Sequence, residues 1–210
     1  MEIHAPHKPI SSVKEFFIHI FTITVGILIA LGLEQAATAY HHHELAENAR
    51  ANILSELRDN ARSLDAHLKN VEKREEEHRQ TLAVLDILIA RKPISEFSMN
   101  LGFDVPTLLS TSWNTAESTG ALAYMDYSDV KRFAGVYDTQ QLLLKIQEEL
   151  SRTASAAMGM IAATKDPAKL STAELIEARQ SAQHSLTELT IWEQIASQLS
   201  KEYAVVLKGS

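Results

Sequence analysis

Near its N-terminus the chain carries a run of 18 residues, Phe16 to Leu33, that contains no Asp, Glu, Lys or Arg. An α-helix of that length rises about 27 Å, which is close to the roughly 30 Å hydrocarbon core of a bilayer. The run therefore predicts a transmembrane helix, and the rest of the chain is expected to be held at a membrane surface. Ser12 and Glu15 form a capping box at its start, so we place the membrane helix at residues 13–33.

A cleaved signal peptide is the alternative interpretation of this run. Ala37, Thr38 and Ala39 offer the small-residue pattern of a cleavage site. However, the apolar region of a signal peptide usually has about 7 to 15 residues. This run is longer, and Glu34 and Gln35 separate it from the possible site. Both differences favour an anchor that stays attached.

The charges on either side of the run predict its orientation. Lys8, Lys14 and the α-amino group precede it, whereas Arg50 is the first basic residue after it. Positive charge favours the cytoplasmic side of a membrane. We therefore expect residues 1–12 to form a cytoplasmic tail. In a bacterial cell this orientation predicts an inner-membrane protein with a periplasmic C-terminal domain.

The composition of the chain predicts helices and excludes some partners. It has seven Gly, five Pro and only 6% aromatic residues, which is typical of helical proteins rather than of sheets. A net charge of -7 without a basic stripe argues against nucleic acid as a partner. The chain has no Cys, which excludes disulfides, a thiol nucleophile and cysteine metal sites.

Three later segments share one pattern, with apolar residues spaced alternately by three and four. The first lies within a stretch free of Gly and Pro that follows the membrane helix, and its patterned part covers 57–91; the others cover 129–164 and 172–207. This spacing predicts helices that pack along a seam. For the third segment the expected seam is Leu175, Ala178, Ala182, Ser185, Leu189, Trp192, Ala196, Leu199, Tyr203 and Val206.

The lengths of these segments predict the architecture. A helix of about 35 residues is about 53 Å long, so the three match. We expect an all-α fold in which the membrane helix continues through a helical stalk at 34–56. An elongated antiparallel bundle of three to four helices would follow at 57–210. Glu75 and His78 interrupt the first seam, either as buried polar residues that fix the register or as a solvated gap.

An irregular segment at 93–127 separates the first two patterned helices. Pro106 suits the first turn of a short helix that reaches about Ser118. On the topology above, the segment is expected to cap the end of the bundle far from the membrane. Its candidate recognition residues are Trp113, Glu117 and Tyr124. The alternative for the tryptophan is a structural plug at the bundle end.

The membrane helix itself carries a candidate interface. His19, Thr22, Gly26, Ala30 and Leu33 recur at three- and four-residue spacing on one face, and the glycine and alanine form a small-xxx-small pair. Small residues let helices approach closely, and an intramembrane His or Thr favours a polar partner over lipid. We therefore expect this face to contact another helix. The alternative is a lipid-exposed monomer with the histidine near the interface.

The chain resembles a family of uncharacterised, membrane-anchored bacterial proteins of unknown function. The resemblance rests on three features in order. They are the anchor Thr24 to Leu31 (TVGILIAL), the helix Leu54 to Asn60 (LSELRDN), and the segment Trp113 to Gly120 (WNTAESTG) followed by a helix with an aromatic such as Tyr137. The resemblance implies a single-pass anchor and an α-helical domain. It brings no activity, substrate or catalytic residue.

The remaining patterns predict no catalytic, cofactor or metal site. His41, His42 and His43 are adjacent, but neighbouring helix positions point about 100° apart, so a polar collar beside Tyr40 is the simpler interpretation. No phosphate-binding loop or HExxH motif occurs. We expect a non-enzymatic protein that acts in assembly, as a homo-oligomer or as an accessory subunit of a membrane complex. A periplasmic ligand-sensing bundle is the alternative.

Overall fold

The computed structural model describes residues 13–94, 98–102, 104–162 and 166–209. Its ordered elements are α1 (Val13–Leu68), α2 (Val71–Ile89), α3 (Thr111–Ser118), the 3-10 turn η1 (Ala121–Tyr124), α4 (Tyr127–Ala162), the 3-10 turn η2 (Pro167–Lys169) and α5 (Thr172–Lys208). No strand occurs among the described residues, so the all-α class predicted from the sequence is confirmed.

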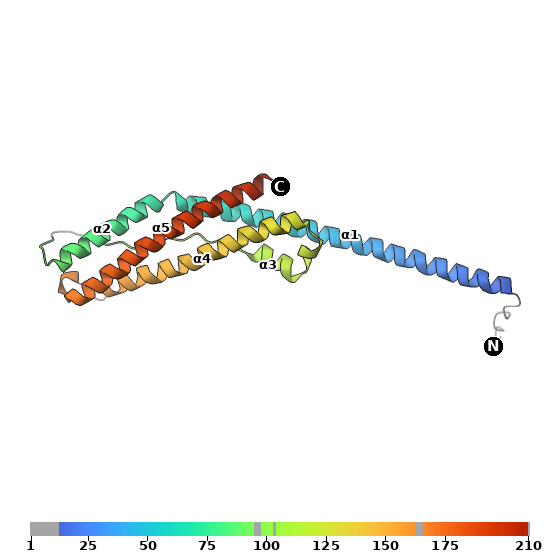
Figure 1. Cartoon of the computed structure of the whole chain (residues 1–210), viewed down its shortest axis with the longest axis horizontal. Helices are drawn as coiled ribbons and strands as arrows, with labels where there is room; N and C mark the ends of the chain where they lie inside the picture. Colours follow the sequence, from blue (N-terminus) through green and yellow to red (C-terminus); the bar gives the residue numbers. More distant parts are fainter. Residues whose placement is uncertain (1–12, 95–97, 103, 163–165, 210) are drawn as a thin grey trace, which may run out of the picture.

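The first half of α1 projects from the rest of the protein as a single rod (Figure 1). Its side chains are exposed from Val13 to His41. This part is long and apolar enough to cross a membrane. The helix then enters the bundle without interruption, and Ala46 is its first buried residue. We call the end of the bundle nearest the rod the proximal end, and the opposite end the distal end.

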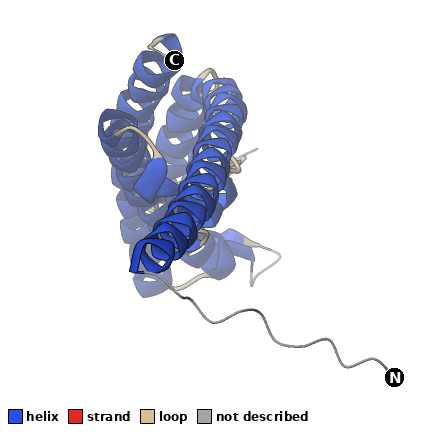
Figure 2. Ribbon diagram, turned by 90° about the vertical axis from the view of Figure 1, so that its right-hand side faces the viewer, coloured by secondary structure: helices blue, strands red, loops and turns tan. Residues whose placement is uncertain are grey.

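The helices of the bundle run along one common direction. From the proximal end, the second half of α1 and then α2 lead away from the rod, α4 runs the same way, and α5 returns antiparallel to them (Figure 1). Seen from the side of the rod, these helices lie behind it (Figure 2). α5 packs against α1, α2 and α4 and so occupies the centre of the arrangement.

The segment at 93–127 does not cap the distal end, which corrects the sequence prediction. After α2 ends at Ile89, the chain returns along the bundle, so that α3 and η1 lie at the proximal end against α1 (Figure 1). About 20 extended residues can span about 65 Å, whereas the return from Ile89 to the level of Glu56 is about 50 Å along the helices. An extended connection therefore suffices, and α4 runs parallel to α1 rather than antiparallel to it.

The position of α3 and η1 shortens the free part of α1. The sequence predicts a stalk at 34–56, but Ile53, Leu54 and Glu56 are buried within the bundle. The free helix beyond the apolar segment is therefore limited to about residues 34–41, or about 12 Å. The α3 start at Thr111 is also later than Pro106 suggests, although its end at Ser118 agrees with the prediction.

The last helix follows its predicted pattern closely. Ser171 and Glu174 form the expected capping box, and α5 ends at Lys208 before Gly209. All ten residues of its predicted seam are buried, which confirms the seam. α5 packs against α1, α2 and α4, and its seam residues belong to both hydrophobic clusters of the core.

Of the two residues that interrupt the first seam, His78 is buried, whereas Glu75 is partly exposed and pairs with Arg79. His78 is fully buried, and its Nε2 lies 3.1 Å from the Ser185 hydroxyl while its Nδ1 lies 2.9 Å from the Arg74 carbonyl. The pair lies between the proximal cluster, which includes Leu189, and the distal cluster, which includes Ala182. The break between α1 and α2 falls at residues 69–70, before Glu75 and His78.

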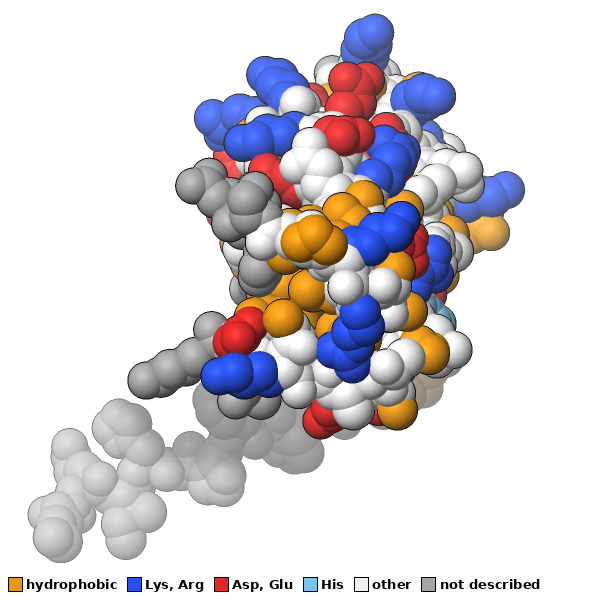
Figure 3. Space-filling model, turned by 90° about the vertical axis from the view of Figure 1, so that its left-hand side faces the viewer, with side chains coloured by type: hydrophobic (Ala, Val, Ile, Leu, Met, Phe, Trp, Pro, Cys, Tyr) orange, Lys and Arg blue, Asp and Glu red, His pale blue; other side chains and the backbone are white. Residues whose placement is uncertain are grey.

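At the distal end, the side chain of Arg91 joins the end of α2 to the start of α5. Arg91 adopts a left-handed backbone conformation with a φ of 53° directly after α2. Its guanidinium donates to the carbonyls of Ala168 and Leu170, both at 2.9 Å, and to the hydroxyl of Thr172 at 3.1 Å. These bonds tie the end of α2 to the start of α5 and offset the backbone strain. Figure 3 looks onto this end, where hydrophobic side chains gather among Lys and Arg.

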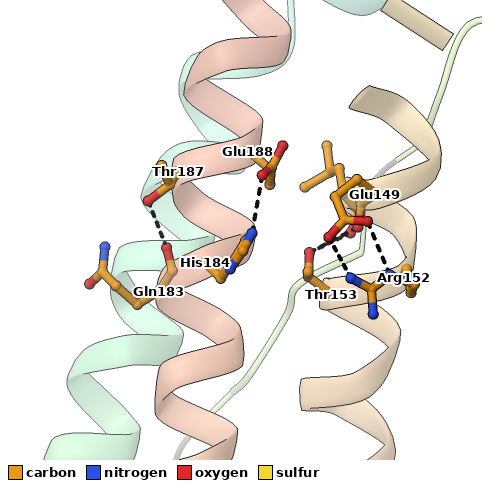
Figure 4. A network of polar contacts seen from close by, with 8 residues as sticks. Glu149, Arg152, Thr153, Gln183, His184, Thr187 and Glu188 are labelled. Carbon is orange, nitrogen blue, oxygen red and sulfur yellow. Dashed lines mark hydrogen bonds and ion pairs between the residues drawn. The ribbon is translucent and has the colours of Figure 1, made fainter. Parts of the chain in front are cut away.

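Many surface ion pairs lie within single helices and do not join them. Glu149 pairs with Arg152 on α4, and His184 with Glu188 on α5, on facing sides of the two helices (Figure 4). Such local pairs at the surface contribute little to stability, because solvent and salt screen them. The association of α4 with α5 therefore depends mainly on their buried seams.

Because His78 is buried, we expect the free energy of unfolding to depend on pH. Burial lowers the pKa of His78, although its bond to the Arg74 carbonyl and the charges of Glu77 and Glu75 oppose this effect. A histidine with a lowered pKa in the folded state binds its proton more readily when unfolded. The free energy of unfolding should thus be fully developed above the ordinary histidine pKa of about 6.5 and fall as the pH drops below it.

Urea unfolding of the detergent-solubilised chain between pH 5 and 8, followed by circular dichroism, measures this effect. His78→Gln should remove most of the slope near pH 6, because glutamine keeps a donor and an acceptor but does not titrate. The matched control is His184→Gln at an exposed position on α5. An identical slope in both variants would contradict the assignment to His78.

Candidate functional site

The predicted interface residues lie on one side of the exposed rod. His19, Thr22, Gly26 and Ala30 are all exposed. The Thr22 hydroxyl donates to the Ile18 carbonyl at 2.9 Å, so its polarity is satisfied within its own helix. A Cβ atom placed on Gly26 would meet nothing within 4 Å. The face is therefore open and smooth, with room for a neighbouring backbone.

This face points away from the bundle. Gly26 and Ile53 are 27 residues apart on one uninterrupted helix. At about 100° per residue they lie about 180° apart around its axis. Ile53 belongs to the buried side of α1. The small-residue face of the rod and the bundle are thus on opposite sides of the same helix.

The three candidate recognition residues differ in their surroundings. The Trp113 ring stacks on Tyr137, with ring centroids 5.3 Å apart, and it packs against the hydrophobic core. Glu117 is exposed. Tyr124, 48% exposed, stacks on His42 of α1 with ring centroids 3.8 Å apart and an interplanar angle of 13°. The stack fastens η1 to the point where α1 enters the bundle.

A buried polar network holds the chain before α3 against three helices. We call it the strap network, and it joins side chains of α1, α4 and α5 to the backbone at 109–112. Its side chains are Glu56, Asn60, Tyr137, Gln140 and Tyr203, all buried.

Asn60 and Gln140 form the centre of the strap network. The Asn60 amide accepts from the Leu109 N–H at 2.9 Å and donates to the Leu109 carbonyl at 2.7 Å, as a neighbouring strand would. Gln140 donates to the same carbonyl at 3.0 Å and to the Ser110 hydroxyl at 2.9 Å. The Tyr203 hydroxyl donates to the Gln140 side-chain carbonyl at 2.6 Å. The backbone of Leu109, which lies outside any helix, thus has its hydrogen bonds satisfied by side chains and not by a neighbouring strand.

Glu56 extends the network to the start of α3. Its carboxylate accepts from the Ser112 N–H at 2.8 Å and from the Tyr137 hydroxyl at 2.7 Å. The N-terminus of a helix leaves backbone N–H groups free, and a carboxylate there is favoured by the helix dipole. Burial, reinforced by the Glu56 bond, raises the pKa of Tyr137 well above its ordinary range. Tyr137 therefore remains a neutral donor.

The sequence contains a signal for this network that hydrophobic patterning misses. Asn60 follows Ile53 and Leu57 at the spacing of the α1 seam, and Gln140 follows Phe133 and Tyr137 on α4 in the same way. Polar residues at seam positions are expected to be hydrogen-bonded when buried. Their partner could not be inferred, because it is the backbone of the irregular segment.

An ion pair joins α1 to α4 at the proximal end. The Arg50 guanidinium donates to the nearly buried Asp129 carboxylate at 2.6 Å, and Arg132 pairs with the other oxygen. Burial opposes the ionisation of Asp129, but the bonds from both arginines outweigh it and hold the pKa of Asp129 below its ordinary value. The start of α4 is therefore fixed beside α1 just beyond the rod.

Two hollows lie on the surface near this end. A groove of about 870 Å³ runs between α4 and α5, with Val136 and Val206 in its floor and Lys131 and Lys201 among its lining residues. A smaller hollow of about 210 Å³ lies between α1 and α3 and is lined mainly by asparagine, threonine and alanine. The described residues hold no group of three or more His, Asp or Glu side chains suited to a metal ion.

Comparisons with protein-family models, curated proteins and solved structures find no match for this chain. Two of the features on which the sequence resemblance rests nevertheless meet in space. Glu56 and Asn60 come from one of them, Trp113 and Tyr137 from the other, and all four lie at or beside the strap network. These motif residues therefore help to hold the segment that precedes α3 against the bundle.

The strap network predicts a large stability effect at Asn60. Asn60→Ala should lower the free energy of unfolding by about 2 to 3 kcal/mol, because the Leu109 N–H and carbonyl lose a buried partner. Urea unfolding in detergent measures this loss. The matched control is Asn52→Ala on the same helix, where the side chain is exposed and the expected change is within about 0.5 kcal/mol. Equal losses in the two variants would contradict the role of the network.

Proposed function

We propose that this protein is a single-pass membrane protein that acts in assembly, either as a homo-oligomer or as an accessory subunit of a membrane complex. The apolar part of α1 is the anchor. The observation that carries the proposal is the opposition of two faces on one helix: the small-residue face of the rod and the buried face in the bundle. A partner helix can therefore approach the anchor without meeting the bundle of the same chain.

The continuity of α1 extends this argument. Because α1 is one helix from Val13 to Leu68, a contact at Gly26 also sets the orientation of the bundle outside the membrane. The α1 surface that continues the small-residue face, at Glu44, Ser55 and Arg62, is exposed and polar. Two copies, or one copy and a partner subunit, could thus pair through the anchor with their bundles on the outside.

The orientation in the membrane is part of the proposal. The positive charges before the apolar segment favour a cytoplasmic N-terminus and a periplasmic bundle at a bacterial inner membrane. Alkaline phosphatase is active only when it folds outside the cytoplasm. Fused after Gly209, it should therefore be active. Activity of a cytoplasm-specific reporter at the same position would overturn this orientation.

The packing of the core supports assembly over ligand sensing. A sensing bundle needs a cavity between its helices for a small molecule. Tyr137 and Trp192, the large aromatic residues that would line such a cavity, are 1% and 0% exposed and belong to the core cluster. Neither lines the two hollows described above. The proposal includes no enzymatic activity and no cofactor, as the sequence motifs predict.

Gly26→Ile tests the proposed interface. The bulky side chain should weaken association of the anchors in a bilayer by about tenfold or more, because it holds the helix backbones apart. Energy transfer between differently labelled copies in lipid vesicles measures self-association. Gly32→Ile is the matched control, since Gly32 lies on the same rod but about 120° away, and a Cβ there also meets nothing within 4 Å.

Self-association and association with another subunit give different results in this design. Energy transfer that falls only in the Gly26 variant supports a homo-oligomer. If labelled copies show no transfer, mild detergent extraction of the native protein should yield a co-purifying membrane protein that is lost in the Gly26 variant and kept in the Gly32 variant. If neither variant changes either measurement, the small-residue face is not an interface.

A further inference from the structure

Three exposed tyrosines lie near the point where α1 enters the bundle. They are Tyr40 on α1, Tyr124 in η1 and Tyr127 at the start of α4, and they are 71%, 48% and 80% exposed. The other two tyrosines of the chain, Tyr137 and Tyr203, are buried in the core. We call the exposed three the tyrosine collar. Three exposed aromatic residues near an emerging helix need an explanation, because burial of their rings is favourable.

The position of the collar is set by α1. Tyr124 stacks on His42, which lies nine residues after Leu33, or about 14 Å along the helix. The headgroup layer of a bilayer extends about 5 to 8 Å beyond the hydrocarbon core. Tyr40 lies between these two levels, about 10 Å beyond Leu33. If Leu33 marks the edge of the hydrocarbon core, Tyr40 and Tyr124 thus stand within roughly one side-chain length of the lipid headgroups, and Tyr127 follows Tyr124 by three residues.

The chemistry of the proximal tip fits such a surface. Residues 118–128, which connect α3 to α4 through η1, contain one charged residue, Asp126, and no Lys, Arg or Glu. The Asp126 carboxylate accepts from the Ser128 N–H at 2.7 Å and from its hydroxyl at 2.6 Å. These bonds lower the pKa of Asp126 and turn its charge toward the first turn of α4. The tip therefore presents aromatic and small side chains.

The tip is also held firmly in this position. Gly120 has a φ of 73°, which permits the tight turn from α3 into η1. The His42 stack fixes η1 to α1, and the Arg50 pair with Asp129 fixes the start of α4. The collar is thus a rigid extension of the anchor rather than a loose loop.

We propose that the tyrosine collar rests on the headgroup layer of the membrane in which α1 is anchored. Tyr and Trp favour this layer because the ring is apolar and the hydroxyl can bond to water or lipid. Because the tip lacks basic residues, the contact depends on the aromatic rings and does not require anionic lipid. The bundle then stands directly on the bilayer, which limits its tilt relative to the plane of the membrane. This inference rests on the proposed membrane anchorage.

The absence of cysteine from the chain allows a direct test. Tyr127→Cys and Leu142→Cys each introduce one thiol at an exposed position on α4, and Leu142 lies about 22 Å farther along the helix. Each variant is labelled with a fluorophore and inserted into phosphatidylcholine vesicles that contain a lipid with a quencher on its headgroup. We expect several-fold stronger quenching at position 127 than at 142, unchanged when the salt concentration rises from about 0.05 to 0.5 M.

The possible outcomes separate the inference from the anchorage on which it rests. Equal quenching at the two positions, in protein that floats with the vesicles, overturns the collar contact and leaves the anchor intact. Protein that does not float overturns both. Quenching that disappears at high salt shows an electrostatic contact and overturns the aromatic one. Protection of the label at 127 in dilute detergent, where no bilayer exists, shows that another protein covers the collar and also overturns the proposal.

Discussion

The unbroken hydrogen-bond ladder of α1 is the constraint on which the rest of the structure depends. Each backbone N–H of this helix bonds four residues back, so the helix transmits a fixed rotation of about 100° per residue from the apolar rod to the bundle. The side of α1 that packs at Ile53 and the side that carries Gly26 are therefore related by geometry and not by flexible linkage. This relation leaves the small-residue face clear of the bundle, and it sets the height at which the proximal tip stands.

The strap network supplies hydrogen-bond partners to the backbone that returns to the proximal end between α2 and α4. The chain must return from the distal to the proximal end between α2 and α4, and this return runs beside helices that offer no backbone partners. Asn60 and Gln140 supply those partners from their side chains, while Glu56 satisfies the start of α3. Buried polar groups are costly unless they are bonded, so the arrangement specifies one path for the return. The ordinary hydrophobic seam of α5 supplies stability to both ends but does not select that path.

The accuracy of the sequence predictions depended on how local the deciding interactions were. The capping box of Ser171 and Glu174 and the ten seam residues of α5 follow from spacing within one helix, and the structure confirms them. The stalk at 34–56 was overestimated, because the residues that cover Ile53 and Leu54 come from distant segments. The distal cap at 93–127 was wrong for the same reason, since a short helix at Thr111 can lie at either end of the bundle. For His78 the sequence left burial and solvation equally open, and the partner that decides between them, Ser185, is 107 residues away.

The sequence by itself determined the apolar segment, the all-α class and the packing face of α5, because these depend on side-chain type at helical spacing. Only the tertiary structure decided where the irregular segment lies, how much of α1 remains free, and that Asn60 and Gln140 bond to its backbone. Those features depend on contacts between segments far apart in the chain, for which a single sequence carries no periodic signal. The surroundings of Tyr124 belong to the second group. Its place beside His42 follows from the return of the chain, and that place puts this member of the tyrosine collar at the base of the rod.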